Sequence, residues 1–150
     1  GVLFAVQAIG SILWALVIPR FKSEKVAYST SLVLGAVGFL STYFIHDQYM
    51  LFVSFLLVGC AWAAMLALPF ALLTNSLSGK SLGSYLGLFN CTICLPQIVA
   101  SLVGGLILGL VGGDVVDGIQ TGQISMLVVA GVSLLLGAVA VFGIKTKREA

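Results

Sequence analysis

The segment from Leu82 to Gly112 reads LGSYLGLFNCTICLPQIVASLVGGLILGLVG and decides the fold of this chain. It has no charged residue and exceeds the roughly 20 residues that a helix needs to cross a bilayer. The segment still contains Asn90, Gln97 and Ser101. Because hydrocarbon cannot hydrogen-bond an amide, such side chains must face another helix or water. Their helical spacing, shared with Cys94, places all of them on one face.

Two prolines interrupt apolar segments, Pro96 in this one and Pro69 in the preceding one. Proline lacks a backbone N–H group and clashes with the carbonyl group four residues earlier, which bends helices. We expect helix flexing at both positions. A polar helix face beside a flexible point is typical of a solute pathway.

The composition restricts the class of protein. The chain has 150 residues, of which 60% are hydrophobic and 8% are charged. A soluble domain has about 25% charged residues, so a soluble fold would expose large apolar patches. The runs are long and lack the alternating pattern of a transmembrane β-barrel. The composition therefore predicts an all-α, polytopic transmembrane helical bundle.

Five apolar runs predict five spans, at about residues 1–18, 26–45, 49–74, 82–112 and 124–144. The seven Lys and Arg residues lie after the first, third and fifth runs, and the other two connections contain Asp but no Lys or Arg. The positive-inside rule then places the start of the chain outside and its C-terminus in the cytoplasm. An odd number of spans with an outside start favours a longer protein with earlier spans.

The polar residues divide the spans into two groups. Gln7 and Trp62 lie in the first and third runs, so these two runs and 82–112 are expected to form the interior. Runs 26–45 and 124–144 have no amide or charge inside, and their small residues, Gly35 and Gly38 among them, suit packing alone. These two runs are expected to lie outside against lipid. The pairs Gly83/Gly87 and Gly105/Gly109 match a pattern that favours close helix contact.

Each candidate site residue has a structural alternative. Asn90 and Gln97 could line a solute pathway or only clamp two helices together. Trp62 could stack against a sugar ring or fill the core. Cys91 and Cys94 match CxxC, but no further ligand lies in the span, so we interpret them as small apolar residues. The spans lack a catalytic acid, base or nucleophile pair, and the sequence predicts no enzyme, cofactor, metal site or nucleic-acid partner.

Three stretches resemble one family: Pro69-Phe-Ala-Leu-Leu-Thr, Leu82-Gly-Ser-Tyr-Leu-Gly-Leu-Phe-Asn90 and Leu95-Pro96-Gln97-Ile-Val-Ala-Ser101-Leu. They are similar to the matching region of the sucrose transporters, sugar:cation symporters of the major facilitator superfamily. The resemblance is dense over about forty residues and moderately specific. It implies that the five runs are spans eight to twelve of twelve. Pro19 departs from the acidic loop motif of many facilitators, which leaves a gating salt bridge there in doubt.

The resemblance implies cation-coupled, proton-driven symport of a di- or oligosaccharide by alternating access in a plasma or bacterial inner membrane. Asn90, Gln97, Ser101, Gln7 and Trp62 are then the expected pathway residues. The expected partners are the sugar, the coupling proton, the lipid bilayer and an amino-terminal half that holds the coupling acid. The alternative hypothesis is a non-transporting membrane scaffold or assembly subunit.

Overall fold

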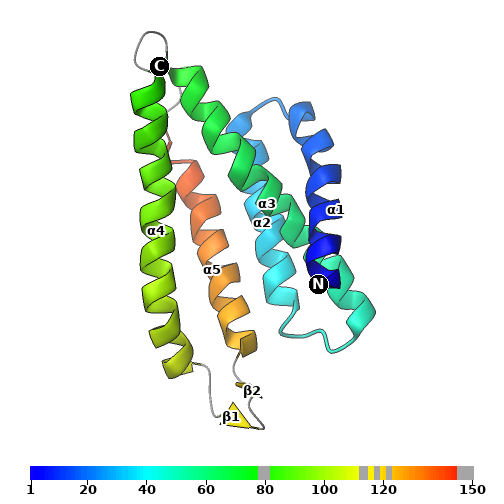
Figure 1. Ribbon diagram of the computed structural model, residues 1–150. Coiled ribbons are helices and arrows are strands. Elements are labelled where there is room, and N and C mark those ends of the chain that lie inside the picture. The colour runs from blue at the N-terminus through cyan, green and yellow to red at the C-terminus, as the bar shows by residue number, and fades with distance from the viewer. Residues whose placement is uncertain (78–81, 112–114, 117–118, 121–122, 145–150) are drawn as a thin grey trace.

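The computed structural model describes residues 1–77, 82–111, 115–116, 119–120 and 123–144 (Figure 1). Each predicted apolar run forms one helix, and the long helices run up and down beside one another. The elements are α1 (Val2–Val17), η1 (Ile18–Arg20), α2 (Glu24–Ser41), α3 (Gln48–Ser76), α4 (Leu82–Val111), β1 (Val115–Val116), β2 (Ile119–Gln120) and α5 (Gln123–Val141). The helical bundle predicted from the composition is confirmed.

The helix ends follow from local chemistry. Pro19 lies in the short helix η1, which ends the first span. The carboxylate of Asp47 accepts a hydrogen bond from the backbone N–H of Tyr49 at 3.0 Å and caps the start of α3. Such a cap satisfies one of the backbone donors that the first turn leaves without a helical partner.

Four helical segments of the described chain are long and apolar enough to cross a membrane: Val2–Arg20, Gln48–Asn75, Gly83–Leu110 and Ile124–Val141. Helix α2 differs from the predicted span 26–45, because it covers Glu24–Ser41 and begins with two charged residues. Its 18 residues extend about 27 Å at 1.5 Å per residue, close to the thickness of a hydrocarbon core.

The connection after α4 contains two short strands among its described residues. They are antiparallel, and Val115 pairs with Gln120 and Val116 pairs with Ile119. These strands extend beyond the helices at one end of the molecule (Figure 1). The helical architecture is unaffected, because the strands contain only two residues each.

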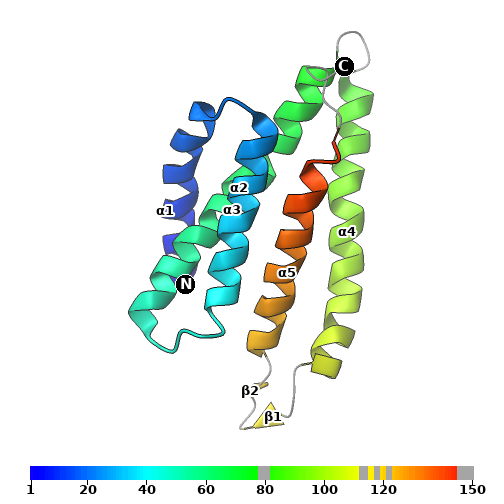
Figure 2. The same ribbon diagram turned by 180° about the vertical axis from the view of Figure 1, so that it is seen from behind.

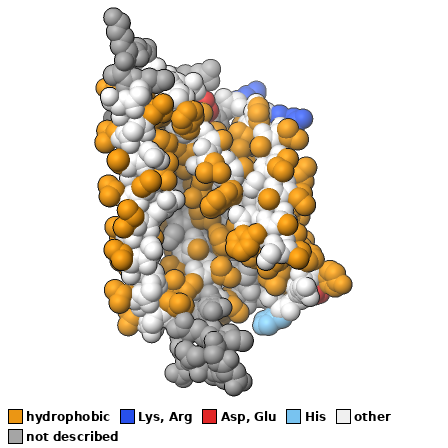
Figure 3. All heavy atoms as spheres, in the orientation of Figure 1, with side chains coloured by type: hydrophobic (Ala, Val, Ile, Leu, Met, Phe, Trp, Pro, Cys, Tyr) orange, Lys and Arg blue, Asp and Glu red, His pale blue; other side chains and the backbone are white. Residues whose placement is uncertain are grey.

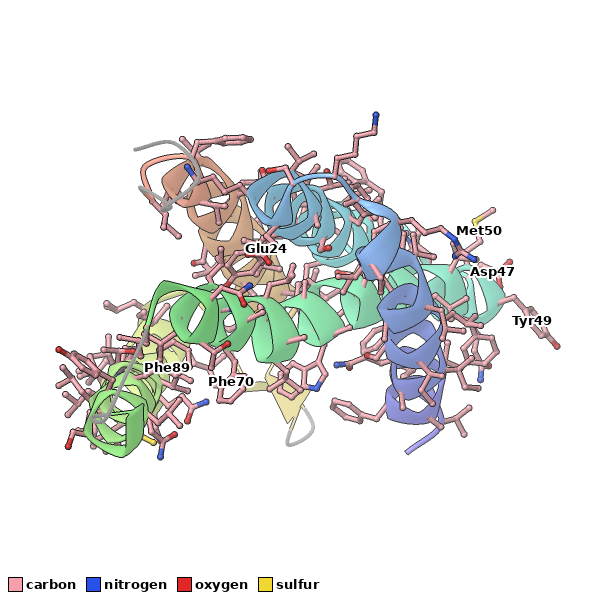
Figure 4. The ribbon with its side chains drawn as sticks, turned by 90° about the horizontal axis from the view of Figure 1, so that it is seen from above. Glu24, Asp47, Tyr49, Met50, Phe70 and Phe89 are labelled. Atoms are coloured by element: carbon pink, nitrogen blue, oxygen red, sulfur yellow. The ribbon has the colours of Figure 1, made fainter. Side chains whose placement is uncertain are left out.

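The helices form two layers. Viewed along the bundle, α2 and α5 lie on one side of α3, and α1 and α4 extend from its other side (Figures 2 and 4). This layering agrees with the grouping of spans predicted from the polar residues. The expectation that the run 26–45 lies outside against lipid stays a prediction. Helix α2 exposes Val26, Val33 and Val37, whereas buried residues occur along most of its length.

Glycines set the closest helix crossings. A Cβ atom on Gly10 of α1 would lie 2.5 Å from the backbone oxygen of Leu56, and one on Gly59 of α3 would meet the backbone oxygen of Gln7. Real Cβ atoms do not approach this closely, so α1 and α3 can cross here only because both positions lack a side chain. Gly38 lies at a similar close crossing of α2 and α3. A Cβ atom on Gly38 would lie 2.6 Å from the backbone oxygen of Ser54.

The predicted close contacts at Gly83, Gly87, Gly105 and Gly109 are not found. A Cβ atom at any of these four positions would have nothing within 4 Å among the described residues. The small-residue pattern indicates that a helix can approach closely, but it does not specify a partner. The packing glycines of this chain lie in α1, α2 and α3 instead.

Serine hydroxyl groups join the same helices. Ser11 of α1 donates to the backbone oxygen of Gly59 at 2.9 Å, and the indole N–H of Trp14 donates to Ser31 of α2 at 2.7 Å. The Ser41 and Ser54 hydroxyls, from α2 and α3, are 2.8 Å apart. Helix α5 is joined to α2 by Ser29, which donates to the Ala138 backbone oxygen at 3.0 Å.

Charge separates the two ends of the bundle. Figure 3 shows Lys and Arg side chains at one end and the His side chain at the other. The Lys and Arg residues at the first end include Arg20 and Lys22, just before α2. The histidine at the other end is His46, just before α3. The described residues therefore keep the one-sided arrangement of basic residues that the sequence predicts.

We expect Gly59→Ala to lower the free energy of unfolding by about 1–3 kcal/mol, because its methyl group has no space against α1. Gly87→Ala is the matched control, since a methyl group there meets nothing within 4 Å. Alanine favours helix over glycine by about 0.5–1 kcal/mol, so the control should be neutral or stabilising. Thermal unfolding of the purified full-length protein checks both, and equal destabilisation would contradict the crossing.

Candidate functional site

The polar face of α4 is the candidate site. Asn90, Gln97 and Ser101 are all exposed in the structure, as the common helix face predicts. Gln97 and Ser101 form no side-chain hydrogen bond with any described residue. The side-chain oxygen of Asn90 has a weak contact with the Cys94 sulfur, 4.0 Å away on the same helix. Within the described chain, these side chains do not clamp α4 to another helix.

The position of Phe89 gives a reference direction on α4. Helix α4 packs against α5, and Phe89 is one of its partly buried residues. Figure 4, viewed from the end where α4 begins, shows Phe89 on the side toward α3 and α5. A right-handed helix seen from this end turns clockwise by about 100° per residue. Asn90, the next residue, is therefore turned by about 100° from the direction of Phe89.

The third span contributes aromatic surface. Trp62, in the middle of α3, is 52% exposed, and Phe70 is 49% exposed. Figure 4 shows Phe70 in the corner between α3 and α4. Trp62 therefore does not act as a core residue of the described chain, where small residues such as Ala61 and Ala64 fill the packed face of α3.

Gln7 lies apart from the α4 amides. It is partly buried at the crossing of α1 and α3, where its backbone oxygen accepts a hydrogen bond from the Ser11 hydroxyl at 3.0 Å. Helices α1 and α4 occupy opposite edges of the bundle with α3 between them (Figures 1 and 2). The structure therefore does not bring Gln7 together with Asn90 and Gln97.

Both prolines lie inside helices that continue past them. Pro69 is partly buried in α3, and Pro96 is exposed in α4, directly before Gln97. Neither position ends its helix, so their predicted role in flexing stays a prediction. The cysteines differ in environment, because Cys60 is buried whereas Cys91 and Cys94 are exposed, and all three are free thiols.

The sequence did not reveal the polar residues that hold the bundle together. Ser29 and Ser54 are buried, and Ser31 is fully buried at 0% exposure. Lys25, expected in the loop, lies in the first turn of α2 and is 8% exposed. A serine in an apolar helix could have indicated such a residue, because lipid cannot form a hydrogen bond with its hydroxyl group. The spacing in the sequence does not show which group accepts that hydrogen bond.

Comparison with known families identifies the chain. The family model described as Major Facilitator Superfamily matches residues 1–150, the whole of the chain. The chain belongs to the Major Facilitator Superfamily. No solved structure matches it at a significant level.

Membership confirms part of what the sequence predicted. Proteins of this superfamily are membrane transporters, so this chain is identified as an integral, multi-pass membrane transporter. The superfamily consists of transporters rather than enzymes, and the predicted major facilitator fold agrees with the helical bundle. The match is to the superfamily as a whole, and it specifies neither the solute nor the coupling ion.

The free energy of unfolding distinguishes amides that are open to solvent from amides that hold two helices together. We expect Asn90→Ala and Gln97→Ala to change the free energy of unfolding by less than about 0.5 kcal/mol, the usual range for exposed positions. Ser31→Ala should lower it by about 1–2 kcal/mol, because the variant leaves the Trp14 N–H without its acceptor. Thermal unfolding of the full-length protein compares them. Loss of stability at Asn90 and Gln97 as large as at Ser31 would show that the amides clamp helices.

Proposed function

We propose that this facilitator transports a neutral, hydroxyl-rich solute, a di- or oligosaccharide such as sucrose or maltose, in symport with a proton. Transport would proceed by alternating access, in which two halves of the protein rock about a site near the middle of the membrane. The chain would contribute spans eight to twelve, and an amino-terminal half would supply the others. Asn90 and Gln97 would form hydrogen bonds with the sugar, and Ser101 would extend their polar face.

The observation that supports this proposal is the exposed, uncharged polar face of α4. Its two amides have no acceptor or donor on another described helix. Each amide offers two N–H donors and a carbonyl acceptor, a combination that suits sugar hydroxyl groups, which both donate and accept. A charged solute would require a compensating charge, and the segments 2–17, 48–76 and 82–111 contain no Asp, Glu, Lys or Arg.

Aromatic surface on the neighbouring helix supports the same solute class. Trp62 and Phe70 expose about half of their surface on α3. A sugar ring has an apolar face of C–H groups that packs well against an aromatic side chain, and its hydroxyl groups remain at the edge for amides. A site with amides on α4 and aromatic rings on α3 would recognise both parts of a sugar.

Coupling to a proton requires an ionisable group that this chain does not place at membrane depth. Among the five α-helices of the described chain, only α2 has charged residues, Glu24 and Lys25, and they lie in its first turn at the basic end of the bundle. We therefore assign the coupling acid to the amino-terminal half, as the resemblance to sucrose transporters implies. The same charge pattern places the basic end of the bundle, with the C-terminus, in the cytoplasm.

The proposal is tested by uptake of labelled sucrose and maltose into vesicles that contain the full-length protein. We expect Asn90→Ala and Gln97→Ala to raise the KM or lower the uptake rate by roughly 2- to 10-fold, the loss of one hydrogen bond worth about 0.5–1.5 kcal/mol. Thr92→Val is the control, because the Thr92 hydroxyl bonds to the Phe89 backbone oxygen of its own helix at 2.7 Å.

Thr92→Val should keep the uptake of the unmodified protein. Unchanged KM and uptake rate in both amide variants would remove the roles assigned to Asn90 and Gln97. Absence of any sugar uptake by the unmodified protein would overturn the solute class and would return the scaffold hypothesis to consideration.

A further inference from the structure

We infer that α3 and α4 form two sugar subsites at different depths in the membrane. Phe70 and Asn90 make the first subsite, which is nearer to the basic end of the bundle. Trp62 and Gln97 make the second, deeper subsite. The inference rests on the proposed function and deepens it, because it specifies the length of the solute: a chain of two or more sugar rings.

Helices α3 and α4 run in opposite directions from adjacent ends. The end of α3 and the start of α4 lie side by side at one end of the molecule (Figures 1 and 2). Because an α-helix rises about 1.5 Å per residue, the number of residues from these ends gives the position of a side chain along each helix. The same views show α3 leaning away from α4, so the two backbones are further apart at greater depth.

The two residues of each subsite lie at nearly the same level. Phe70 is six residues before the end of α3 and Asn90 is eight residues after the start of α4, about 9 and 12 Å along the helices. Trp62 and Gln97 are fourteen and fifteen residues from the same ends, about 21 and 22 Å along. Each aromatic ring therefore has one amide at its own level. The larger ring, that of Trp62, belongs to the level at which the helices are further apart.

The two aromatic rings lie on the exposed side of α3. Trp62 and Phe70 are about half exposed, and Leu66, midway between them, is exposed as well. Ala64 and Leu68 are buried, and each lies two residues from Leu66, which is about 200° around the helix. The packed side of α3 is thus opposite to the side that carries the rings. Figure 4 shows Phe70 in the corner between α3 and α4, so the side with the rings borders α4 at the first subsite.

The amides of α4 repeat the spacing of the rings. Seven residues separate Asn90 from Gln97, about 10.5 Å and nearly two full turns, so both amides lie on one face. Eight residues, or about 12 Å, separate Trp62 from Phe70. A single sugar ring is shorter than this separation and contacts one subsite at a time. A chain of rings contacts both subsites and gains the aromatic packing and the amide hydrogen bonds of each.

Double-mutant cycles in maltose binding test the two subsites. The dissociation constant of maltose is measured by isothermal titration calorimetry on the full-length protein in lipid nanodiscs. The double variants combine two substitutions within one subsite or across the two, and the single variants are Phe70→Leu, Asn90→Ala, Trp62→Leu and Gln97→Ala. Leucine removes the ring and keeps an apolar side chain. Thermal unfolding shows which variants are folded, and methionine replaces leucine in any ring variant that is not.

We expect each single substitution to weaken maltose binding roughly 2- to 10-fold. A double variant within one subsite should lose less than the product of its single effects, because the first substitution leaves the sugar ring poorly positioned for the second side chain. A double variant across the subsites should lose the full product, because sites more than about 7–10 Å apart contribute independently. Glucose, a single ring, should bind roughly tenfold more weakly than maltose.

Coupling between Trp62 and Asn90, or full products in all four double variants, would overturn the pairing. Glucose binding as tight as maltose binding would overturn the assigned length. In both cases, uptake of labelled sugar by the unmodified protein would leave the proposed function intact. A protein that neither binds nor takes up sucrose or maltose would contradict the proposed function and, with it, the subsites.

Discussion

Hydrocarbon offers no hydrogen-bond partner, and this constraint underlies the arrangement of polar groups in the chain. Helices α1, α2, α3 and α5 meet this requirement with hydrogen bonds to one another. The hydroxyl groups of Ser11 and Ser29 reach backbone carbonyl oxygens of neighbouring helices, and Ser31 accepts the indole N–H of Trp14. Glycine at positions 10 and 59 brings α1 and α3 close enough for the Ser11 bond to form. The same residues that pack the bundle therefore also satisfy its polar groups.

Helix α4 meets the constraint differently. It carries two exposed amides, Asn90 and Gln97, that have no hydrogen-bond partner on another described helix. In a membrane transporter, a hydrated pathway and its solute can supply those partners. The contrast between internally satisfied serines and open amides distinguishes the packed part of the chain from the helix face to which we assign solute binding.

Much of the fold could be predicted from the sequence, because helix length and the absence of charge depend on local composition. The predicted use of Gly35 and Gly38 in packing is confirmed, since both are buried in α2. The neighbouring residue that each glycine meets on another helix was not predictable. Gly35 meets Ala61 and Gly87 meets nothing described, although both lie in similar small-residue patterns. Periodicity determines which residues share a face, but the neighbour of that face depends on the arrangement of all the helices.

The site shows the same division between local and long-range information. The spacing of Asn90, Gln97 and Ser101 predicted one shared helix face, and the structure places all three, exposed, on α4. Gln7 was grouped with them from its residue type alone, and the structure separates it from α4 by the width of α3. The exposure of Trp62 also depends on packing, since the small residues beside it in sequence fill the core in its place.

The central claim is that the amide face of α4 contacts water, and accessibility to a membrane-impermeant maleimide tests it most directly. Single cysteines replace Asn90 or Gln97 in a full-length protein without other cysteines, and His46→Cys in the exposed connection before α3 serves as the positive control. The account predicts that both helix positions react from at least one side of the membrane and that bound sugar slows the reaction. Failure of both to react from either side, while the control reacts, would contradict it.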